Sequence, residues 1–307
     1  MYADMVTSDV DVAAARLRTG GLVAIPTETV YGLAADATDP VAVARIFEIK
    51  ARPRDHPLIV HLAHADQLDE WARLPSDDAL LLADHGWPGP LTIIVSRSAA
   101  VLDVVTGVRD TVGLRVHAHH LARELIERTG PLAAPSANRY GGVSPTTAQH
   151  VFDDLASLLD PDRDVILDGG ACPIGVESTI VDCVADPPQV LRPGAVTHDQ
   201  VQGLLKARLA PASGPTRASG MRSSHYAPRS AVRLVDDLDD AIALRTVTPE
   251  AEIMEQDADL AIAARELYGR LRDADERRVA TLIIVLPPAE GLGHAIRDRL
   301  AKAAAPR

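Results

Sequence analysis

Short apolar runs alternate with helix-like stretches along the first 200 residues of the chain. Runs rich in β-branched residues and bounded by turn-forming residues predict strands, whereas apolar residues at helical spacing predict helices. Strands are expected at 22–25, 58–62, 91–95, 111–116, 131–135, 164–167 and 178–182, and helices at 40–50, 76–86 and 121–130. This alternation predicts a layered α/β domain, and its irregular connections favour a twisted mixed sheet flanked by helices.

Two of these helices carry end signals in the sequence. Asp39 is expected to cap the helix at 40–50, and Pro40 suits its first position, where no backbone donor is needed. Gly130 suits the C-terminal cap of the helix that begins at 121.

The composition changes at residues 210–230, which are rich in Ala, Ser, Gly and Pro and are typical of a linker. Beyond the linker, strands are expected at 231–235 and 281–288, and helices at 257–274 and 293–304. We therefore predict a larger α/β domain at 1–209, a linker at 210–230, and a small Rossmann-like α/β domain at 231–307.

Composition narrows the class of protein. Hydrophobic residues make up 47% of the chain and aromatic residues only 3%, so the core must consist mainly of Ala, Val, Leu and Ile. Asp4, Asp9 and Asp11 argue against a signal peptide, and no apolar run is long enough to span a membrane. The two cysteines, Cys172 and Cys183, are expected to be reduced thiols in a cytoplasmic protein.

Charge is unevenly distributed. The net charge of -12 argues against non-specific nucleic-acid binding, so an anionic ligand needs a local cluster of cations. One such cluster is KARPRDHPL, where Lys50, Arg52 and Arg54 are held in a loop stiffened by two prolines. This loop is either a solvated charged surface or an anion site.

Other polar positions suit a small-molecule pocket. Thr27 and Thr29 follow a predicted strand and either form an ordinary turn or point together into a pocket. Arg115 lies inside an apolar strand pattern, so it must pair with a protein carboxylate or with a ligand carboxylate. The Gly-rich loop at 135–147 precedes a helix expected near Thr146. It is either a long surface loop with an ordinary cap at Ser144 or, as its features favour, a loop that binds phosphate or nucleoside.

Several common signatures are missing. The sequence has no P-loop, no G-x-G-x-x-G, no C-x-x-C and no H-E-x-x-H. The histidines of HAHH (117–120), with His61 and His64, have no convincing further ligand at a typical zinc spacing, so no dedicated metal site is expected.

A set of motifs spread over residues 10–205 resembles the L-threonylcarbamoyladenylate synthase family. In the family's order, these motifs are PTETVYGLAADA, the loop from Lys50 to Leu58, IVHL, GLRV, PLAAPSAN, GGVSPTTAQHV, GVESTIVD and LRPGAVT. SGM and HYAP within the linker resemble the longer, two-domain form of the family.

The resemblance implies a YrdC-like catalytic domain with a deep basic cleft. It implies a nucleotidyltransferase that forms threonylcarbamoyl-AMP and pyrophosphate from L-threonine, bicarbonate and ATP, with Mg²⁺ accompanying the ATP. A separate tRNA threonylcarbamoyl transferase would then modify tRNA, so this chain itself needs at most a weak tRNA contact.

The resemblance also implies site residues. The L-threonine pocket would consist of Thr29, His61, Arg115, Ala134 and Ser178. The ATP site would consist of Lys50, Arg52, His56, Thr111, Ser136, Asn138, Ser144, Arg192 and Tyr226. Lys50 and Arg52 would be catalytic by neutralising charge, Arg115 would bind the amino-acid carboxylate, and Tyr226 would fold over the nucleotide.

Several positions depart from the family pattern. His56 is often Asn in relatives, His117 stands where Pro is more usual, and Ser223 and Ser224 replace an aromatic residue and a cation before HYAP. Two alternatives also remain open. A non-catalytic RNA-binding module could use the same cleft, although the acidic charge and few aromatics disfavour it. A hydrogenase-maturation type of carbamoyl transferase would need more cysteines than the two present.

Overall fold

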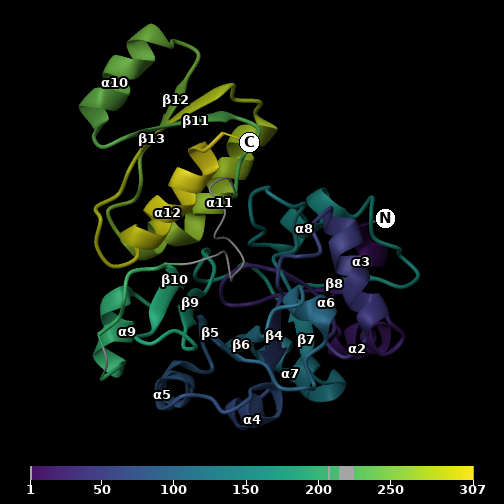
Figure 1. The fold of residues 1–307 in the computed structure, drawn as a ribbon. Helices are drawn as coiled ribbons and strands as arrows, with labels where there is room; N and C mark the ends of the chain where they lie inside the picture. The colour runs from purple at the N-terminus through teal and green to yellow at the C-terminus, as the bar shows by residue number, and fades with distance from the viewer. Residues whose placement is uncertain (1, 207, 214–224, 307) are drawn as a thin grey trace.

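A ten-stranded and a three-stranded sheet organise the computed structural model, which describes residues 2–206, 208–213 and 225–306 (Figure 1). The larger sheet has the order β1-β8-β2-β3-β7-β4-β6-β5-β9-β10. Its strands are β1 (Val6–Thr7), β2 (Val23–Ile25), β3 (Gly32–Asp36), β4 (Ile59–Leu62), β5 (Leu91–Ser96), β6 (Thr111–Val116), β7 (Leu132–Ala134), β8 (Val165–Leu167), β9 (Thr179–Asp182) and β10 (Gln189–Arg192).

Helices flank this sheet, and the first domain ends with one of them. They are α1 (Tyr2–Met5), α2 (Val10–Arg18), α3 (Pro40–Lys50), the 3₁₀ turn η1 (Ala65–Gln67), α4 (Leu68–Trp71), α5 (Asp77–Gly86), α6 (Asp103–Thr106), α7 (His120–Thr129), α8 (Ala148–Leu155) and α9 (His198–Leu204). The pairs β4·β6 and β5·β9 are parallel, whereas β3·β7 and β5·β6 are antiparallel. The predicted mixed α/β sheet is therefore confirmed.

The C-terminal domain is a separate parallel sheet with three helices. It contains β11 (Ala231–Val235), α10 (Leu238–Val247), β12 (Glu252–Met254), α11 (Leu260–Glu276), β13 (Thr281–Val285) and α12 (Gly293–Ala304). Figure 1 shows α11 and α12 between this sheet and the first domain, with α10 on the opposite side. Residues 214–224 of the predicted linker lie outside the described residues.

The end signals of α3 act as expected. The side chain of Asp39 accepts hydrogen bonds from the backbone of Val41 and Ala42, and Pro40 occupies the first turn. At the other end, Ala51 takes the left-handed conformation with φ 53°. Gly130 caps α7 with φ 93°, so both predicted caps are confirmed.

Some elements differ from the prediction. The strand β3, with the sequence GLAAD, lacks β-branched residues and was not expected. It forms because its backbone pairs with β2 and β7 on both sides, so tertiary pairing overrides weak strand propensity. The helices α2 and α10 and the short strand β12 were also not expected.

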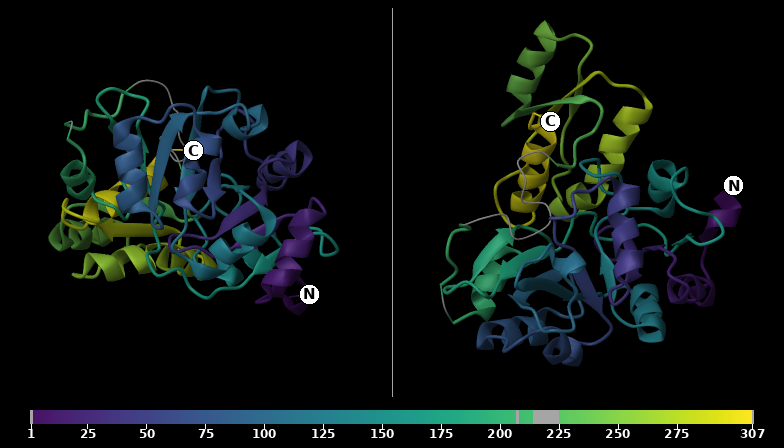
Figure 2. Two further views of the ribbon diagram at one scale, coloured as in Figure 1. Left: turned by 90° about the horizontal axis from the view of Figure 1, so that it is seen from below. Right: turned by 45° about the vertical axis from the view of Figure 1, so that its right-hand side comes forward.

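The two domains share one hydrophobic cluster. Val30, Val143 and Val176 of the first domain pack with Leu267 and Leu271 of α11. Gly175 (φ 85°) lies so close to α11 that a Cβ there would be 2.4 Å from the Cα of Arg265. Glycine is therefore required for this close approach. Figure 2 shows the C-terminal domain packed beside the first domain from two further directions.

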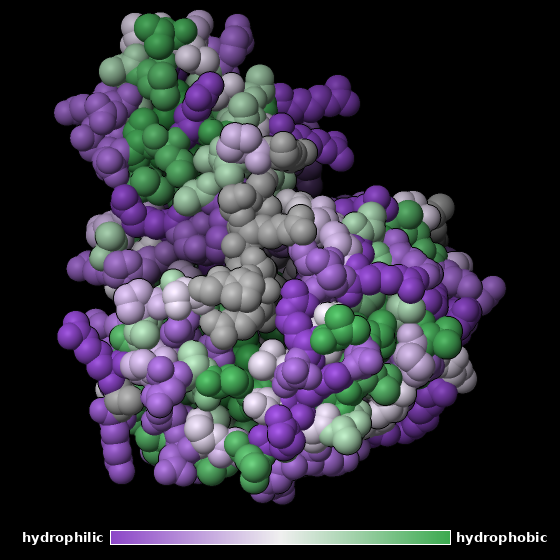
Figure 3. Space-filling model, in the orientation of Figure 1, coloured by the Kyte–Doolittle hydropathy of each residue, from purple (hydrophilic) through white to green (hydrophobic). Residues whose placement is uncertain are grey.

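The surface is mixed in character. Figure 3 shows hydrophilic residues along the junction of the two lobes and hydrophobic residues on the C-terminal lobe. Exposed apolar side chains of α10 include Leu238, Ile242 and Val247. Within the described ranges, no helix is both long and apolar enough to cross a bilayer.

Candidate functional site

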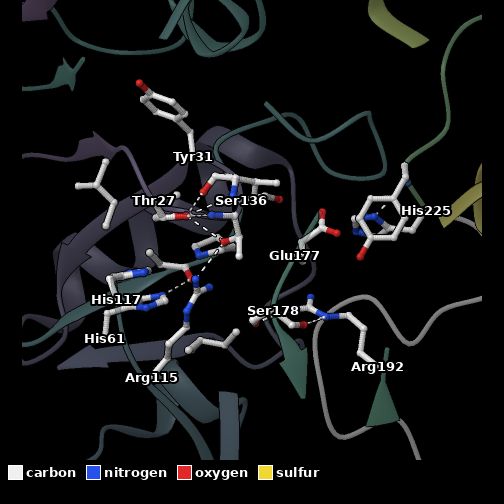
Figure 4. Close-up of a pocket in the computed structure, with 18 of the residues that line it drawn as sticks. Thr27, Tyr31, His61, Arg115, His117, Ser136, Glu177, Ser178, Arg192 and His225 are labelled. Carbon is white, nitrogen blue, oxygen red and sulfur yellow. Dashed lines mark hydrogen bonds between the residues drawn. The ribbon is translucent and has the colours of Figure 1, made fainter. Parts of the chain in front are cut away.

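A pocket lies where the strand ends of the large sheet meet the end of the linker (Figure 4). All five residues predicted to bind L-threonine line it, together with four of those predicted to bind ATP. These are Thr29, His61, Arg115, Ala134 and Ser178, and Arg52, Ser136, Arg192 and Tyr226. The pocket therefore gathers residues that are more than 190 positions apart in the sequence.

The sheet order explains why these side chains meet. The strands β7, β4 and β6 are neighbours, and His61 is the register partner of Arg115. Paired residues on parallel strands present their side chains on the same face. Ala134 ends β7 beside Ile59 of β4, which places the threonine set on adjacent strands.

Thr27 and Thr29 form a turn and also line the pocket. The hydroxyl of Thr27 donates to the carbonyl of Val30 at 2.7 Å and accepts from the backbone of Thr29 at 3.0 Å. The two hydroxyl oxygens are 2.9 Å apart. Thr27 and Thr29 therefore form a turn and, in the same conformation, line the pocket, so both interpretations are correct.

Arg115 pairs with a protein carboxylate in this structure. Its guanidinium lies 2.7 Å from Oε1 of Glu28 and also donates to the carbonyl of Gly89 and to the hydroxyl of Thr29. Both charged side chains are buried. Burial alone would raise the pKa of Glu28, but Arg115 and His117 hold it well below its ordinary value, so Glu28 is ionised at neutral pH.

Two buried histidines stack behind this ion pair. The rings of His61 and His117 are 4.4 Å apart and nearly parallel. Burial, followed by neighbouring positive charge, lowers the pKa of each, so both are neutral at pH 7. Nε2 of His61 lies 3.2 Å from the carbonyl of Ala134. That carbonyl can only accept, so Nε2 carries the proton and Nδ1 is left as an acceptor.

Hydroxyls and a cation meet on the opposite wall. Arg192 donates to the carbonyl of Ser178 at 3.0 Å and to its hydroxyl at 2.9 Å. The same hydroxyl is 2.8 Å from that of Thr92 in β5. Figure 4 shows Ser178 and Arg192 beside each other, below Glu177 and on the opposite side of the pocket from His61 and His117.

Lys50 supports the pocket from behind. Its ammonium donates to the carbonyl of Ser136 at 2.6 Å and to that of Asn138. Burial, followed by the charge of Arg52, lowers its pKa well below the ordinary value. Lys50 therefore fixes the loop after β7, whereas Arg52 lines the cavity and donates to the carbonyl of Pro57.

The other predicted ATP residues lie outside the pocket wall. Nδ1 of His56 is 3.3 Å from the hydroxyl of Tyr140. The side chain of Asn138 accepts from Ser136 and donates to the carbonyl of Gly142. Thr111 begins β6 at the far end from Arg115. Ser144 reaches the pocket indirectly, since it donates to Glu177 at 2.6 Å.

Arg54 remains at the surface. It pairs with Glu48 at 3.0 Å, and about two thirds of each side chain is exposed. An ion pair of this kind contributes little, about 0.2–1 kcal/mol. Of the three cations in the loop, only Arg52 lines the pocket.

The sequence prediction missed four polar residues of the pocket wall, Tyr31, His117, Glu177 and His225, and also Glu28, which pairs with Arg115 of that wall. Each lies within or next to a motif that pointed to the site, so adjacency to a motif residue was the available signal. The two carboxylates affect the charge of the site, because Glu177 lines the pocket together with Arg52, Arg115 and Arg192, and Glu28 pairs with Arg115. A strongly basic cleft therefore stays a prediction.

The part of the chain that the structure describes contains no cluster of His, Cys, Asp or Glu suited to a metal ion. Both cysteines are buried thiols, and burial raises the pKa of each to about 12. They are therefore poor nucleophiles at neutral pH.

Fold and site together define a two-domain α/β protein with a buried ligand pocket of guanidinium, imidazole, hydroxyl and carboxylate groups. The chain belongs to the Sua5/YciO/YrdC family, whose model, described as telomere recombination, matches residues 15–194. A second model, the C-terminal domain of threonylcarbamoyl-AMP synthase, matches residues 195–305. The family and its two-domain form, inferred from the motifs, are thereby confirmed.

Relatives of known name cover nearly the whole chain. It is similar to the threonylcarbamoyl-AMP synthase of Pyrococcus abyssi, with 39% identity over 95% of this chain and 93% of that protein. The Bacillus subtilis enzyme of the same name is 37% identical over 99% and 96%. The crystal structure of P. abyssi Sua5 complexed with L-threonine superposes with a TM-score of 0.90 at 36% identity, covering 96% of this chain and 94% of that one.

Proposed function

We propose that this protein is a threonylcarbamoyl-AMP synthase that joins L-threonine, bicarbonate and ATP and releases pyrophosphate. One observation carries the proposal: all five residues expected to bind threonine line the same pocket as Arg52, Ser136 and Arg192 from the expected ATP set. Relatives with this name, similar along nearly the full chain, support it.

The chemistry suits a pocket without a protein nucleophile. The amine of threonine and bicarbonate form an N-carboxylate with loss of water. A carboxylate oxygen then attacks the α-phosphorus of ATP, the bond to the β-phosphate oxygen breaks, and pyrophosphate leaves. This is a nucleotidyl transfer between anionic partners, so positioning and charge neutralisation are the main requirements.

The threonine side of the pocket offers complementary groups. Arg115 would bind the amino-acid carboxylate, sharing its guanidinium with Glu28. Nδ1 of His61 is buried and has no hydrogen-bond partner among the described residues, and Oε2 of Glu28 lies 3.4 Å from Nδ1 of His117. These acceptors suit the donors of threonine, its α-amine and its hydroxyl.

The ATP side would use cations and hydroxyls. Arg52 and Arg192 would neutralise the phosphates, while Lys50 holds the loop that carries Ser136. Since the described residues form no metal cluster, Mg²⁺ would arrive bound to the triphosphate, and no step is assigned to it. Tyr226, already part of the wall, would lie against the nucleotide.

The test is pyrophosphate release by the purified protein with Mg²⁺ and ATP. We expect release that requires both L-threonine and bicarbonate, and a loss of about 100-fold in Arg52→Ala, the size expected for removing one charge-stabilising group. Arg54→Ala is the matched control, because Arg54 lies on the same loop but is exposed. Release independent of threonine, or equal losses in both variants, would contradict the proposal.

An RNA-binding module without catalysis is the alternative. It predicts tRNA binding that weakens steeply with salt, and no turnover of nucleotide. The same preparation separates the two functions. A cytoplasmic location, transfer of the product to a tRNA threonylcarbamoyl transferase and a weak tRNA contact belong to the proposal and await their own tests.

A further inference from the structure

Glu177 lines the pocket but is held by the C-terminal domain. The hydroxyl of Tyr268 in α11 lies 3.1 and 2.9 Å from its two carboxylate oxygens. Nε of Arg299 in α12 donates to Oε2 at 2.6 Å. From the first domain, Ser144 donates to Oε1. The carboxylate thus accepts hydrogen bonds from three side chains, two of them from the second domain.

The same two side chains hold the end of the linker. The guanidinium of Arg299 lies over the ring of Tyr226, 5.2 Å from its centre, and the ring of Tyr268 stacks on Tyr226 at 5.8 Å. The backbone of His225 donates to the carbonyl of Lys302 in α12. Tyr226 and Glu177 are therefore fixed by one cluster of C-terminal residues.

An unpaired carboxylate in this position would oppose an anionic ligand. Glu177 belongs to the same pocket wall as Arg192. The positive charge of Arg192 is expected to face the phosphates of ATP. Burial alone would raise the pKa of Glu177, but Arg299 and Arg192 together lower it to about 2, so it is ionised. In a buried pocket, this charge repels phosphate unless it is neutralised.

We propose that Tyr268 and Arg299 of the C-terminal domain are positioning residues that neutralise Glu177, so that the pocket of the first domain can accept a polyphosphate. The inference rests on the proposed function and specifies what the second domain contributes to it. Arg299 offsets the carboxylate charge, and Tyr268 fixes its orientation toward Ser144. Without them, Glu177 would draw Arg192 away from the ligand.

A second ion pair between the domains provides a matched control. Arg272 of α11 contacts Asp154 of α8 at 2.6 Å, and neither side chain lines the pocket. Asp154→Asn therefore weakens an inter-domain contact without changing the charge of the pocket wall. If ATP affinity falls only because the two domains pack less tightly, this control should show the same loss.

The experiment compares Tyr268→Phe, Arg299→Met, the double variant Arg299→Met/Glu177→Gln and the control Asp154→Asn. For each full-length protein, the KM values for ATP and threonine are measured by pyrophosphate release, ATP affinity by calorimetry, and folding by thermal melting. We expect ATP to bind about tenfold more weakly in Tyr268→Phe, as for loss of hydrogen bonds to a charged group. The loss of ATP affinity should be larger in Arg299→Met, and the double variant should recover most of that affinity.

The threonine KM should change less than twofold throughout, and the control should match the wild type. Three results would overturn the inference. They are equal changes in the KM values for ATP and threonine, an equal loss of ATP affinity in the control Asp154→Asn, and a folded double variant that does not recover ATP affinity. If Arg299→Met does not fold, Tyr268→Phe decides alone, with unchanged ATP affinity as the contrary result. Absence of activity in the wild type would instead refute the proposed function, and calorimetry with ATP would still test the role of Tyr268.

Discussion

At the residue scale, the pocket is built from buried ionisable groups whose neighbours decide their charge. Glu28 and Arg115 are 87 positions apart and form one ion pair. The sequence showed that Arg115 needed a partner, because an isolated cation inside a strand pattern is costly. The sequence could not show which carboxylate lies near Arg115, because that depends on where the loop after β2 places Glu28 relative to β6.

His225 gives a residue-scale prediction for stability against pH. Burial lowers its pKa to about 3, whereas in the unfolded chain it is near 6.5. Between these values the unfolded state binds more protons, so stability is full above pH 6.5 and falls as the pH drops toward 3. We expect His225→Asn, which keeps an acceptor for the backbone of Tyr226, to lose less stability on acidification.

The check on His225 is urea unfolding at several pH values from 7 to 4. The difference between the two proteins should grow as the pH falls and reach up to about a few kcal/mol. His64→Asn is the control, because His64 is exposed. Parallel pH profiles for wild type and His225→Asn would show that His225 does not titrate in this way.

At the element scale, predictability followed the strength of local signals. The helix α3 was predicted with both bounds because its cap, first-turn proline and apolar spacing agree. The strand β3 was missed because its local sequence is Gly- and Ala-rich and only its neighbours hold it in the sheet. Motif residues likewise located the pocket, but partners such as Glu177 and His117 required the three-dimensional fold.

The C-terminal cap of α3 gives an element-scale prediction. Ala51 has φ 53° and is exposed. A non-glycine residue in the left-handed region costs about 1–2 kcal/mol of folding free energy. Glycine removes this cost, but it also increases the conformational entropy of the unfolded chain, which offsets part of the gain. We expect Ala51→Gly to stabilise the protein by about 0.5 kcal/mol in thermal or urea unfolding. A clear loss of stability would mean that the loop to Arg52 needs alanine for another reason.

At the scale of the whole molecule, the two domains form one unit through a shared hydrophobic cluster and the contacts of α11 and α12. The linker composition predicted a small second domain, but not how closely it packs. Close packing depends on long-range contacts such as that of Gly175 with α11, which no local pattern reveals.

Gly175 tests this docking. Gly175→Ala would place a methyl group 2.4 Å from the α11 backbone, so we expect a loss of well over 2 kcal/mol and a larger radius of gyration in solution scattering. Gly170→Ala is the control: Gly170 has φ 83° and open space around it, so only the backbone cost of about 1 kcal/mol applies. Equal effects of the two substitutions would show that the contact with α11 does not hold the domains together.

The aromatic residues, few as they are, have a practical consequence. His56, Tyr140, His225, Tyr226 and Tyr268 follow one another in successive ring contacts from the first domain, through the linker, to α11. Three of the five tyrosines in the chain belong to this series. Trp71 and Trp87 lie in the core of the first domain instead. The near-ultraviolet signal of tyrosine is thus a built-in optical reporter of how the two domains meet, readable without any attached dye.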